Sequence, residues 1–291
     1  MTGYLANDCL TCIPGTKTFW HDLLEWLPDL EDTTGGYTSY GLLADKIERK
    51  SSPDYIVRNA TYFRKLDVSV PTISLLQDIQ EGWLRQQQVE VCNNSRVTVF
   101  NSEYTRAMYP EIIGDVRVIP LGVDSELFVP EARRKEYDVL FVGASTVYPK
   151  GFDILLDIIT KTDYKFCLVM KENYQLEHER VAVFNNVNSK QLKNIYNESK
   201  VLVCTSRQEA QHLVGIEAGF CNVPIICSNV GIYYNRKDGG WGDHANEDYV
   251  GAITIMLNNL DKYNPREYWL SQGVDKESCK VSWQKLVKEI V

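Results

Sequence analysis

Two glutamates, Glu209 and Glu217, stand eight positions apart between two short apolar runs, at residues 201–204 and 223–227. The pattern predicts a strand, a loop, a helix and a second strand, so Glu209 should lie at the carboxyl end of the first strand, where open α/β sheets bind ligands. A carboxylate there can accept hydrogen bonds from sugar hydroxyls, and the backbone N–H groups of residues 211–215 could bind a diphosphate. The spacing by itself also fits two solvent-facing glutamates.

A second candidate site is the loop 143–151, which contains Gly143 and Lys150 and connects a predicted strand to a predicted helix. Backbone N–H groups at the start of a helix, with a lysine beside them, can bind an anion. The loop lacks the GxxxxGK[ST] spacing of a Walker motif. An ordinary connecting loop with an exposed lysine explains the residues equally well.

Two features near the N-terminus carry weaker signals. Gly15, in the Pro-Gly-Thr-Lys segment before the first predicted helix, would allow a ligand to approach the backbone closely, although a plain turn is the favoured interpretation. Cys9 and Cys12 have CxxC spacing, but a zinc site needs a second pair or nearby histidines, and the four histidines are scattered. A redox pair remains an alternative to reduced structural thiols, which we favour for the eight cysteines.

Several common catalytic patterns are absent from the sequence. It contains no GxSxG, HExxH or EF-hand motif, and no GxGxxG follows the first strand. These absences argue against a serine hydrolase of the α/β-hydrolase type, a zinc protease and a nicotinamide or flavin enzyme.

The elements that would position these residues alternate between strands and helices, which predicts mainly parallel sheets with helices on both faces. The expected strands are residues 55–57, 72–76, 97–100, 116–120, 138–142, 166–169, 181–184, 201–204 and 223–227. The expected helices are residues 19–27, 40–49, 83–91, 152–159, 191–198 and 282–290, with a further helix after Glu209.

Length and composition are those of a soluble globular protein of about two domains, with 291 residues of which 44% are hydrophobic and 24% charged. No apolar run approaches the roughly 18 residues of a membrane span, and no secretory signal is visible, so we expect a cytoplasmic location, with peripheral membrane association left open. Residues 1–130 hold 11 basic and 18 acidic residues, which argues against a nucleic-acid partner.

A proline and a run of charges at residues 128–137 interrupt the alternation, and we place a domain boundary there. A long solvated loop within one domain is the alternative. The predicted division is 1–128 and 129–275, followed by a final segment, 276–291, that contains the last helix.

Taken in order, these segments resemble the retaining glycosyltransferases of family 4. The resemblance rests on the runs Val-Ile-Pro-Leu-Gly-Val-Asp at 118–124, Val-Leu-Phe-Val-Gly at 139–143, Lys-Gly-Phe-Asp at 150–153, and Ser206, Glu209, Glu217 and Val-Pro-Ile-Ile at 223–226. It covers roughly residues 95–290 and is weaker over the first 90.

The resemblance implies a GT-B fold, in which two Rossmann-like domains with parallel sheets face each other across a cleft. Residues 1–128 would bind the acceptor, residues 129–275 the nucleotide-sugar, with UDP- or GDP-sugars as the expected donors, and the last helix would cross back to the first domain. The reaction would move the sugar, with retention, to a glycan, protein or lipid-linked acceptor, without a metal or other cofactor.

The resemblance also implies roles for individual residues. Lys150 would hold the diphosphate and Glu209 the sugar hydroxyls, and these two would be the catalytic residues. The other donor-binding residues would be Gly15, Gly143, His212, Leu213 and Glu217, with Glu217 on the ribose. The acceptor site has one candidate, Asp78.

Three departures from the family pattern bear on this assignment. Ala144 and Ser145 stand where the family has an arginine after the glycine. Residues 76–78, Leu-Gln-Asp, stand where many members have a histidine, and Glu-Ala-Gln-His-Leu-Val at 209–214 replaces Glu-Gly-Phe-Gly-Leu-Pro. The missing arginine keeps a non-catalytic nucleotide-sugar-binding protein as an alternative, and a sugar-nucleotide epimerase of the same fold is a second one.

Overall fold

The computed structural model describes residues 2–6, 14–32, 53–60, 69–237 and 239–291. The chain forms two compact units, one of Met1–Gly122 with Glu277–Val291 and the other of Val123–Lys276. The chain enters and leaves the second unit side by side, because Val123 pairs in parallel with Asp275 and its N–H donates to the carbonyl of Val274 at 3.0 Å. The boundary predicted after Phe128 therefore falls inside the second unit.

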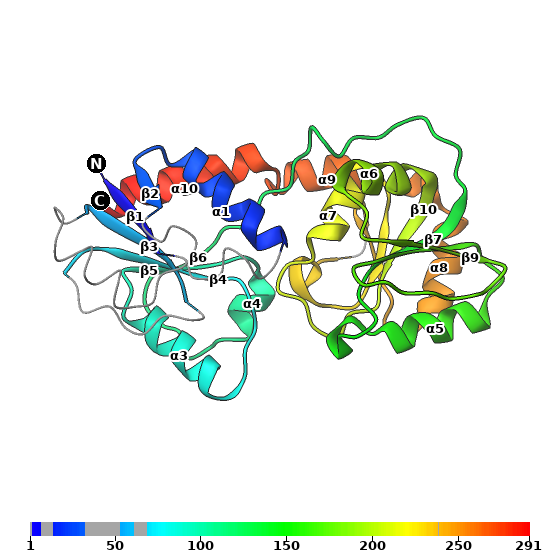
Figure 1. The fold of residues 1–291 in the computed structure, drawn as a ribbon, viewed down its shortest axis with the longest axis horizontal. Coiled ribbons are helices and arrows are strands. Elements are labelled where there is room, and N and C mark those ends of the chain that lie inside the picture. Colours follow the sequence, from blue (N-terminus) through cyan, green and yellow to red (C-terminus); the bar gives the residue numbers. More distant parts are fainter. Residues whose placement is uncertain (1, 7–13, 33–52, 61–68, 238) are drawn as a thin grey trace. The chain divides into compact units, whose positions relative to one another are not determined.

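The first unit is built on a six-stranded parallel sheet of order β2-β1-β3-β4-β5-β6 (Figure 1). Its strands are β1 Gly3–Ala6, β2 Leu30–Asp32, β3 Tyr55–Asn59, β4 Thr72–Leu76, β5 Val97–Phe100 and β6 Val116–Val118. Every residue of β3, β4 and β5 is buried, as expected for parallel strands with both faces covered. These three strands and β6 are confirmed, whereas β1 and β2 were not predicted.

The described helices of the first unit are α1 Pro14–Trp26, α3 Gly82–Asn93, α4 Glu103–Ala107 and α10 Lys276–Ile290, which begins one residue before the unit's second segment. Helix α1 begins at Pro14, so the turn predicted around Gly15 is wrong. Proline fits the first helical position, where its missing N–H has no intrahelical partner. The helix predicted at 40–49 and the Cys9–Cys12 pair lie outside the described residues.

The last helix packs against the first one within this unit. The ring of Trp283 on α10 lies 6.2 Å from the ring of Phe19 on α1, and the side-chain amide of Gln284 donates to the carbonyl of Trp26 at 2.9 Å. Helix α10 begins six residues before the predicted start at Ser282. Although it is at the end of the sequence, its apolar face thus completes the core of the N-terminal unit.

The second unit has its own six-stranded parallel sheet, of order β12-β11-β10-β7-β8-β9. Its strands are β7 Tyr137–Gly143, β8 Phe166–Met170, β9 Val181–Asn185, β10 Ser199–Cys204, β11 Ile225–Cys227 and β12 Gly242–His244. The strand order reverses between β7 and β10. Ligands of open parallel sheets bind at such a switch point, outside the carboxyl ends of the strands.

Helices cover both faces of this sheet, and successive residues of β7 point to opposite sides. Leu140 belongs to a buried cluster with Ile216 of α7, whereas Val139 and Phe141 belong to a second cluster with Leu155 of α5. The helices are α5 Phe152–Lys161, α6 Ser189–Glu198, α7 Leu213–Phe220, α8 Tyr249–Leu257 and α9 Pro265–Ser271. None of the helices in the described part of the chain is long and apolar enough to cross a membrane.

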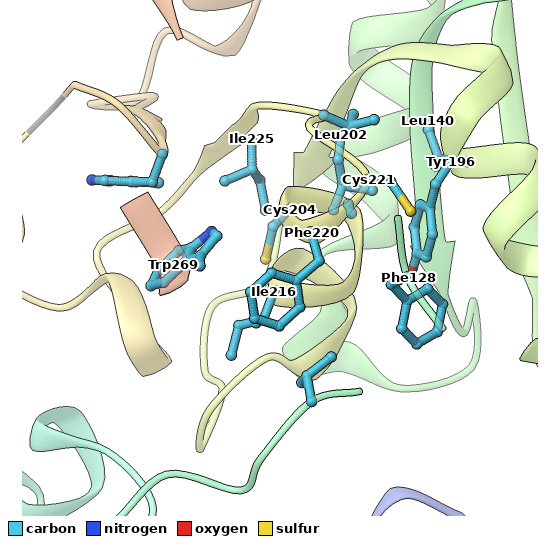
Figure 2. Packing of buried hydrophobic residues seen from close by; sticks show 14 of the residues in the cluster. Phe128, Leu140, Tyr196, Leu202, Cys204, Ile216, Phe220, Cys221, Ile225 and Trp269 are labelled. Carbon is cyan, nitrogen blue, oxygen red and sulfur yellow. The ribbon is translucent and has the colours of Figure 1, made fainter. Parts of the chain in front are cut away.

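Helix α7 reaches the core through a close approach to α9. Figure 2 shows Ile216 and Phe220 of α7 among the buried side chains of the first of these clusters, with Trp269 of α9 beside them. A Cβ at Gly219 would lie 2.5 Å from the indole nitrogen of Trp269, whose side chain is fully buried. Glycine is therefore required here for close packing rather than for an unusual backbone conformation.

We expect Gly219→Ala to destabilise the protein by about 1–3 kcal/mol, because overpacking outweighs the roughly 1 kcal/mol that alanine gains in a helix. The measurement is the free energy of unfolding in urea. In the double variant Gly219→Ala/Trp269→Phe the smaller ring makes room for the added methyl group. Its loss of stability should therefore be smaller than the sum of the losses in the two single variants. Strict additivity of the two single changes would contradict the close approach.

Candidate functional site

The first part of the site is the turn that carries Lys150, which is held against the end of β10. After β7 ends at Gly143, the chain passes through a short 3₁₀ helix, η1 Tyr148–Lys150, and Gly151 then adopts a left-handed conformation with φ of 63°. A Cβ on Gly151 would overlap the Thr205 carbonyl and lie 2.9 Å from its carbon, so only glycine fits this contact. The Thr205 hydroxyl also donates to the Lys150 carbonyl at 3.0 Å.

This contact brings Lys150 and Glu209 together, although they are 59 positions apart. The Lys150 ammonium lies 2.6 Å from Oε1 of Glu209, and the Ser206 hydroxyl donates to the same oxygen at 2.7 Å. The Glu209 side chain is 11% exposed and that of Lys150 is 34% exposed. Burial opposes ionisation of Glu209, but the Lys150 ammonium and the Ser206 hydroxyl, which both contact its Oε1, hold the pKa of this carboxyl below its usual value.

Helix α7 begins beside this pair, and His212 is its N-cap, with φ of 72° and ψ of 68°. The helix starts at Leu213, so Gly215 lies in its first turn and not in the loop that the sequence predicted up to residue 215. Nδ1 of His212 lies 2.8 Å from the Tyr233 hydroxyl. Burial lowers the pKa of His212 to about 4, so its ring is neutral at neutral pH.

Glu217 lies in the second turn of α7 and faces the body of the unit. The hydroxyl of the buried Tyr196 donates to its Oε2 at 2.8 Å. Burial raises the pKa of Glu217 to about 7. The alternative of two solvent-facing glutamates is therefore wrong for both positions, since Glu209 is held by Lys150 and Glu217 by Tyr196.

Two further predicted site residues lie in the first unit. Gly15 is the second residue of α1. Asp78 follows β4, and its two carboxylate oxygens accept from the side-chain amides of Gln88 at 2.9 Å and Gln80 at 2.7 Å. The structure brings together Lys150, Glu209 and His212 of the second unit, and it gives Asp78 a place in a separate network of amide side chains.

The loop after Gly143 has an acidic contact at the place where the family pattern has an arginine. The hydroxyl of Ser145 donates to Glu172 at 2.6 Å, and the Ser145 N–H donates to the same carboxylate. The nearby cation Arg207 is bound to Asp153 through two nitrogens and lies 4.4 Å over the ring of Tyr148. Arg207 is thus paired with Asp153, whereas Lys150 is the cation that contacts Glu209 at this edge of the sheet.

Three of these side chains could also be considered as metal ligands. A sulfur of Cys204, a carboxylate oxygen of Glu209 and a ring nitrogen of His212 lie within 4.8 Å of one another. The Lys150 ammonium already neutralises Glu209, and burial raises the pKa of the Cys204 thiol to about 12, so this thiol keeps its proton. The donor set is therefore a poor fit for a divalent cation.

Sequence reasoning missed Tyr233 and assigned no role to Tyr196 or to Ser206, the second of which it gave only as part of the family pattern. Tyr233 is the last residue of a 3₁₀ helix, η2 Gly231–Tyr233, and it is 21 positions from the histidine that it contacts. No periodicity or motif marks such a contact. The periodicity of the chain predicted the elements but not the hydroxyl groups that hold the glutamate and histidine side chains.

Comparison with known proteins finds a family match within the second unit. Residues 136–259 match the family described as glycosyl transferases group 1. One chain of the human phosphatidylinositol N-acetylglucosaminyltransferase is 29% identical over 148 residues, which cover 45% of this chain and 30% of that protein. An uncharacterised glycosyltransferase from Methanocaldococcus jannaschii is 30% identical over 189 residues, which cover 58% of this chain and 50% of its own. The chain thus spans half or less of these relatives' lengths.

Solved structures share the fold over the whole chain. Sucrose-phosphate synthase from Thermosynechococcus elongatus superposes with a TM-score of 0.81 at 13% identity, covering 99% of both chains. HepE from Anabaena, solved in complex with UDP and glucose, superposes with a TM-score of 0.76 at 14% identity, covering 99% of this chain and 100% of that one. The predicted fold, GT-B with two Rossmann-like parallel sheets, is thereby confirmed.

The raised pKa of Glu217 gives a prediction about stability. Because the folded protein binds this proton more tightly than the unfolded chain, the free energy of unfolding should fall as pH rises from about 4.5 to about 7. Glu217→Gln, which has no charge and can still accept from Tyr196, should be more stable than the wild type at pH 8 by about 1–3 kcal/mol.

The measurement is urea unfolding of both proteins at pH 5 and pH 8. Glu177→Gln, at an exposed glutamate of the same unit, is the matched control and should follow the wild type at both values. An equal difference between Glu217→Gln and the wild type at the two pH values would contradict the assignment.

Proposed function

We propose that this protein, whose residues 136–259 belong to the glycosyl transferases group 1 family, is a retaining glycosyltransferase. It transfers a sugar from a nucleotide-sugar to a glycan, protein or lipid-linked acceptor. The observation that carries the proposal is the Lys150–Glu209 pair at the carboxyl ends of β7 and β10, where the strand order reverses. A cation for a diphosphate and a carboxylate for sugar hydroxyls stand together at the edge where parallel sheets bind ligands.

In this proposal the ion pair opens when the donor binds. Lys150 turns from Glu209 to the diphosphate, and Glu209, still held by Ser206, accepts hydrogen bonds from the hydroxyls of the sugar. Glu209 suits this role because its carboxyl is ionised at neutral pH. A carboxylate accepts hydrogen bonds from neutral hydroxyl groups but repels phosphate oxygens, so it selects the sugar end of the donor.

The remainder of the donor follows the first turns of α7. The backbone N–H groups at the start of this helix, from Leu213 onward, suit the negative phosphates, because a helix N-terminus carries partial positive charge. Glu217, in the next turn, binds the ribose hydroxyls. We assign Gly143, at the end of β7, to the donor site as well, although a Cβ at this position would lie 2.8 Å from the ring of Phe141. The similarity to HepE, which was solved with UDP and glucose bound, supports a uridine nucleotide as the donor class.

The proposed chemical step needs stabilisation of charge rather than an enzymatic nucleophile. As the bond between the anomeric carbon and the diphosphate breaks, negative charge grows on the leaving oxygen, and the Lys150 ammonium stabilises it. The acceptor hydroxyl attacks from the same face that the diphosphate leaves. Its proton passes to the leaving diphosphate oxygen as the new glycosidic bond forms, and the configuration is retained. The acceptor is bound by the first unit. We assign Asp78 of this unit to the acceptor and Gly15 to the phosphates of the donor.

One observation favours a second function. Glu172 occupies the Ser145 N–H and hydroxyl where the family pattern supplies an arginine, so the diphosphate has one cation fewer to stabilise its charge. A protein that binds nucleotide-sugars without transferring them would tolerate this loss. Steady formation of a glycosylated product distinguishes the enzyme from the binding protein.

We expect Lys150→Ala to lower turnover about 10²-fold or more, because it removes the charge that stabilises the leaving diphosphate. The measurement is the rate of nucleoside diphosphate release at saturating donor. Lys200→Ala is the matched control, since Lys200 is 38% exposed and forms a similar pair with Asp138 at the opposite end of β10, with an N–O distance of 2.7 Å. Equal turnover in Lys150→Ala and Lys200→Ala would contradict the role of Lys150.

Donor binding can be measured without knowing the acceptor. At 100 times its Kd, the correct nucleotide-sugar should raise the free energy of unfolding by about 2.7 kcal/mol, seen as a higher melting temperature. A panel of nucleotide-sugars and nucleoside diphosphates should contain one nucleotide that stabilises the wild type, and Glu217→Ala should lose that effect. No stabilisation by any nucleotide would contradict the proposed function.

A further inference from the structure

His212 adopts a backbone conformation that L-residues rarely hold. Its φ of 72° and ψ of 68° lie in the left-handed region, which costs a residue with a side chain roughly 1–2 kcal/mol. In the family pattern Glu-Gly-Phe-Gly-Leu-Pro, a glycine occupies the same place in the run. A strained residue beside a ligand site persists only where the surrounding structure holds it.

Tyr233 holds the side chain of His212 in place. The Tyr233 hydroxyl lies 2.8 Å from Nδ1 of His212, and the two rings meet edge to face with centroids 5.6 Å apart. Tyr233 has no exposed surface. Its ring stacks on Trp241 at 5.1 Å and contacts Trp269 at 6.0 Å, so the hydroxyl is fixed from behind by two indoles.

Two glycines leave space for this contact. A Cβ at Gly215 would overlap the Tyr233 hydroxyl and lie 2.8 Å from Nδ1 of His212. A Cβ at Gly231 would lie 2.9 Å from the Gln211 carbonyl oxygen, which accepts from the N–H of Ile232 at 3.0 Å. The loop 209–212 is therefore clamped to η2 through its backbone as well as through the histidine ring.

The hydrogen bond to Tyr233 engages Nδ1 of His212, so Nε2 is the ring nitrogen that can meet a ligand. Burial raises the pKa of the Tyr233 hydroxyl well above its usual value, so the hydroxyl keeps its proton and can act as the donor to Nδ1. The neutral ring then carries its own hydrogen on Nε2. A ring nitrogen of His212 lies within 4.8 Å of a Glu209 carboxylate oxygen, so the imidazole and the Glu209 carboxylate line the same site.

We propose that the His212 side chain determines which donor sugar binds, by donating from Nε2 to a sugar oxygen beside the hydroxyl that Glu209 accepts, and that Tyr233 is its positioning residue. This inference rests on the proposed function. The neutral ring adds no charge for a phosphate, and the neighbouring carboxylate repels one, so an uncharged sugar oxygen is the partner that the two groups can share.

The test compares binding of a nucleotide-sugar with binding of its nucleoside diphosphate, by calorimetry, in four proteins. In the wild type the sugar should contribute affinity, and His212→Gly should reduce that contribution about tenfold while the diphosphate Kd changes by less than about twofold. Tyr233→Phe keeps the packed ring. It should change the affinity ratio, the Kd of the nucleoside diphosphate divided by that of the nucleotide-sugar, in the same direction as His212→Gly. Tyr249→Phe is the matched control, because it removes a buried hydroxyl that donates instead to the Cys204 carbonyl at 3.1 Å.

A spectroscopic readout separates positioning from packing. Nitrogen-15 NMR of the unliganded wild type should show His212 with its hydrogen on Nε2, and Tyr233→Phe should show a mixture of both tautomers. Hydrogen on Nδ1 in the wild type would overturn both the donation from Nε2 of His212 and the role of Tyr233.

The affinity ratio separates this proposal from the proposed function. An unchanged ratio in His212→Gly, or an equal loss of sugar and diphosphate affinity, would overturn the role of His212 alone. A wild type that binds no nucleotide at all would overturn the proposed function, and this role with it.

Discussion

The candidate site depends on the contact between Gly151 and the carbonyl of Thr205, which lets two loops from different strands meet without an intervening side chain. The meeting of Lys150 with Glu209 follows from it. The Lys150 turn lies on the end of β10, the backbone of Arg207 donates to the Pro149 carbonyl at 2.7 Å, and the ammonium reaches Glu209. A partly buried lysine is stable here because a carboxylate faces it.

Helix α7 connects the candidate site to the core of the unit. Its N-terminus is fixed by His212 and Tyr233, its middle by the bond between Glu217 and Tyr196, and its end by the close approach of Gly219 to Trp269. The three contacts are made by residues 212–219, which belong to one short helix and its N-cap. A shift of α7 along its axis would therefore disturb all of them at once, so the position of the N-terminal amides is set by packing well behind the site.

Much of the fold could be predicted because parallel strands are buried on both faces and read as apolar runs, as in β4 and β5. Strand β2 could not, since two of its three residues are exposed acids, and α8 could not, since its run is apolar without a clear period. Within the site, Lys150 and Glu209 stand at motif positions. Tyr233 does not, because a single hydroxyl contact across 21 positions leaves no local pattern.

The two glutamates that first mark the sequence illustrate the limit of a motif. Both are carboxyl groups and they lie eight positions apart, yet their surroundings shift their pKa values in opposite directions. Glu209 faces the Lys150 ammonium and stays ionised, whereas Glu217 accepts from the Tyr196 phenol, and burial raises its pKa to about 7. Glu209 can therefore act only as an acceptor near neutral pH, while Glu217 can donate or accept. The spacing places both carboxyls beside one helix, but the group facing each of them determines its charge, and so the kind of ligand atom that each can bind.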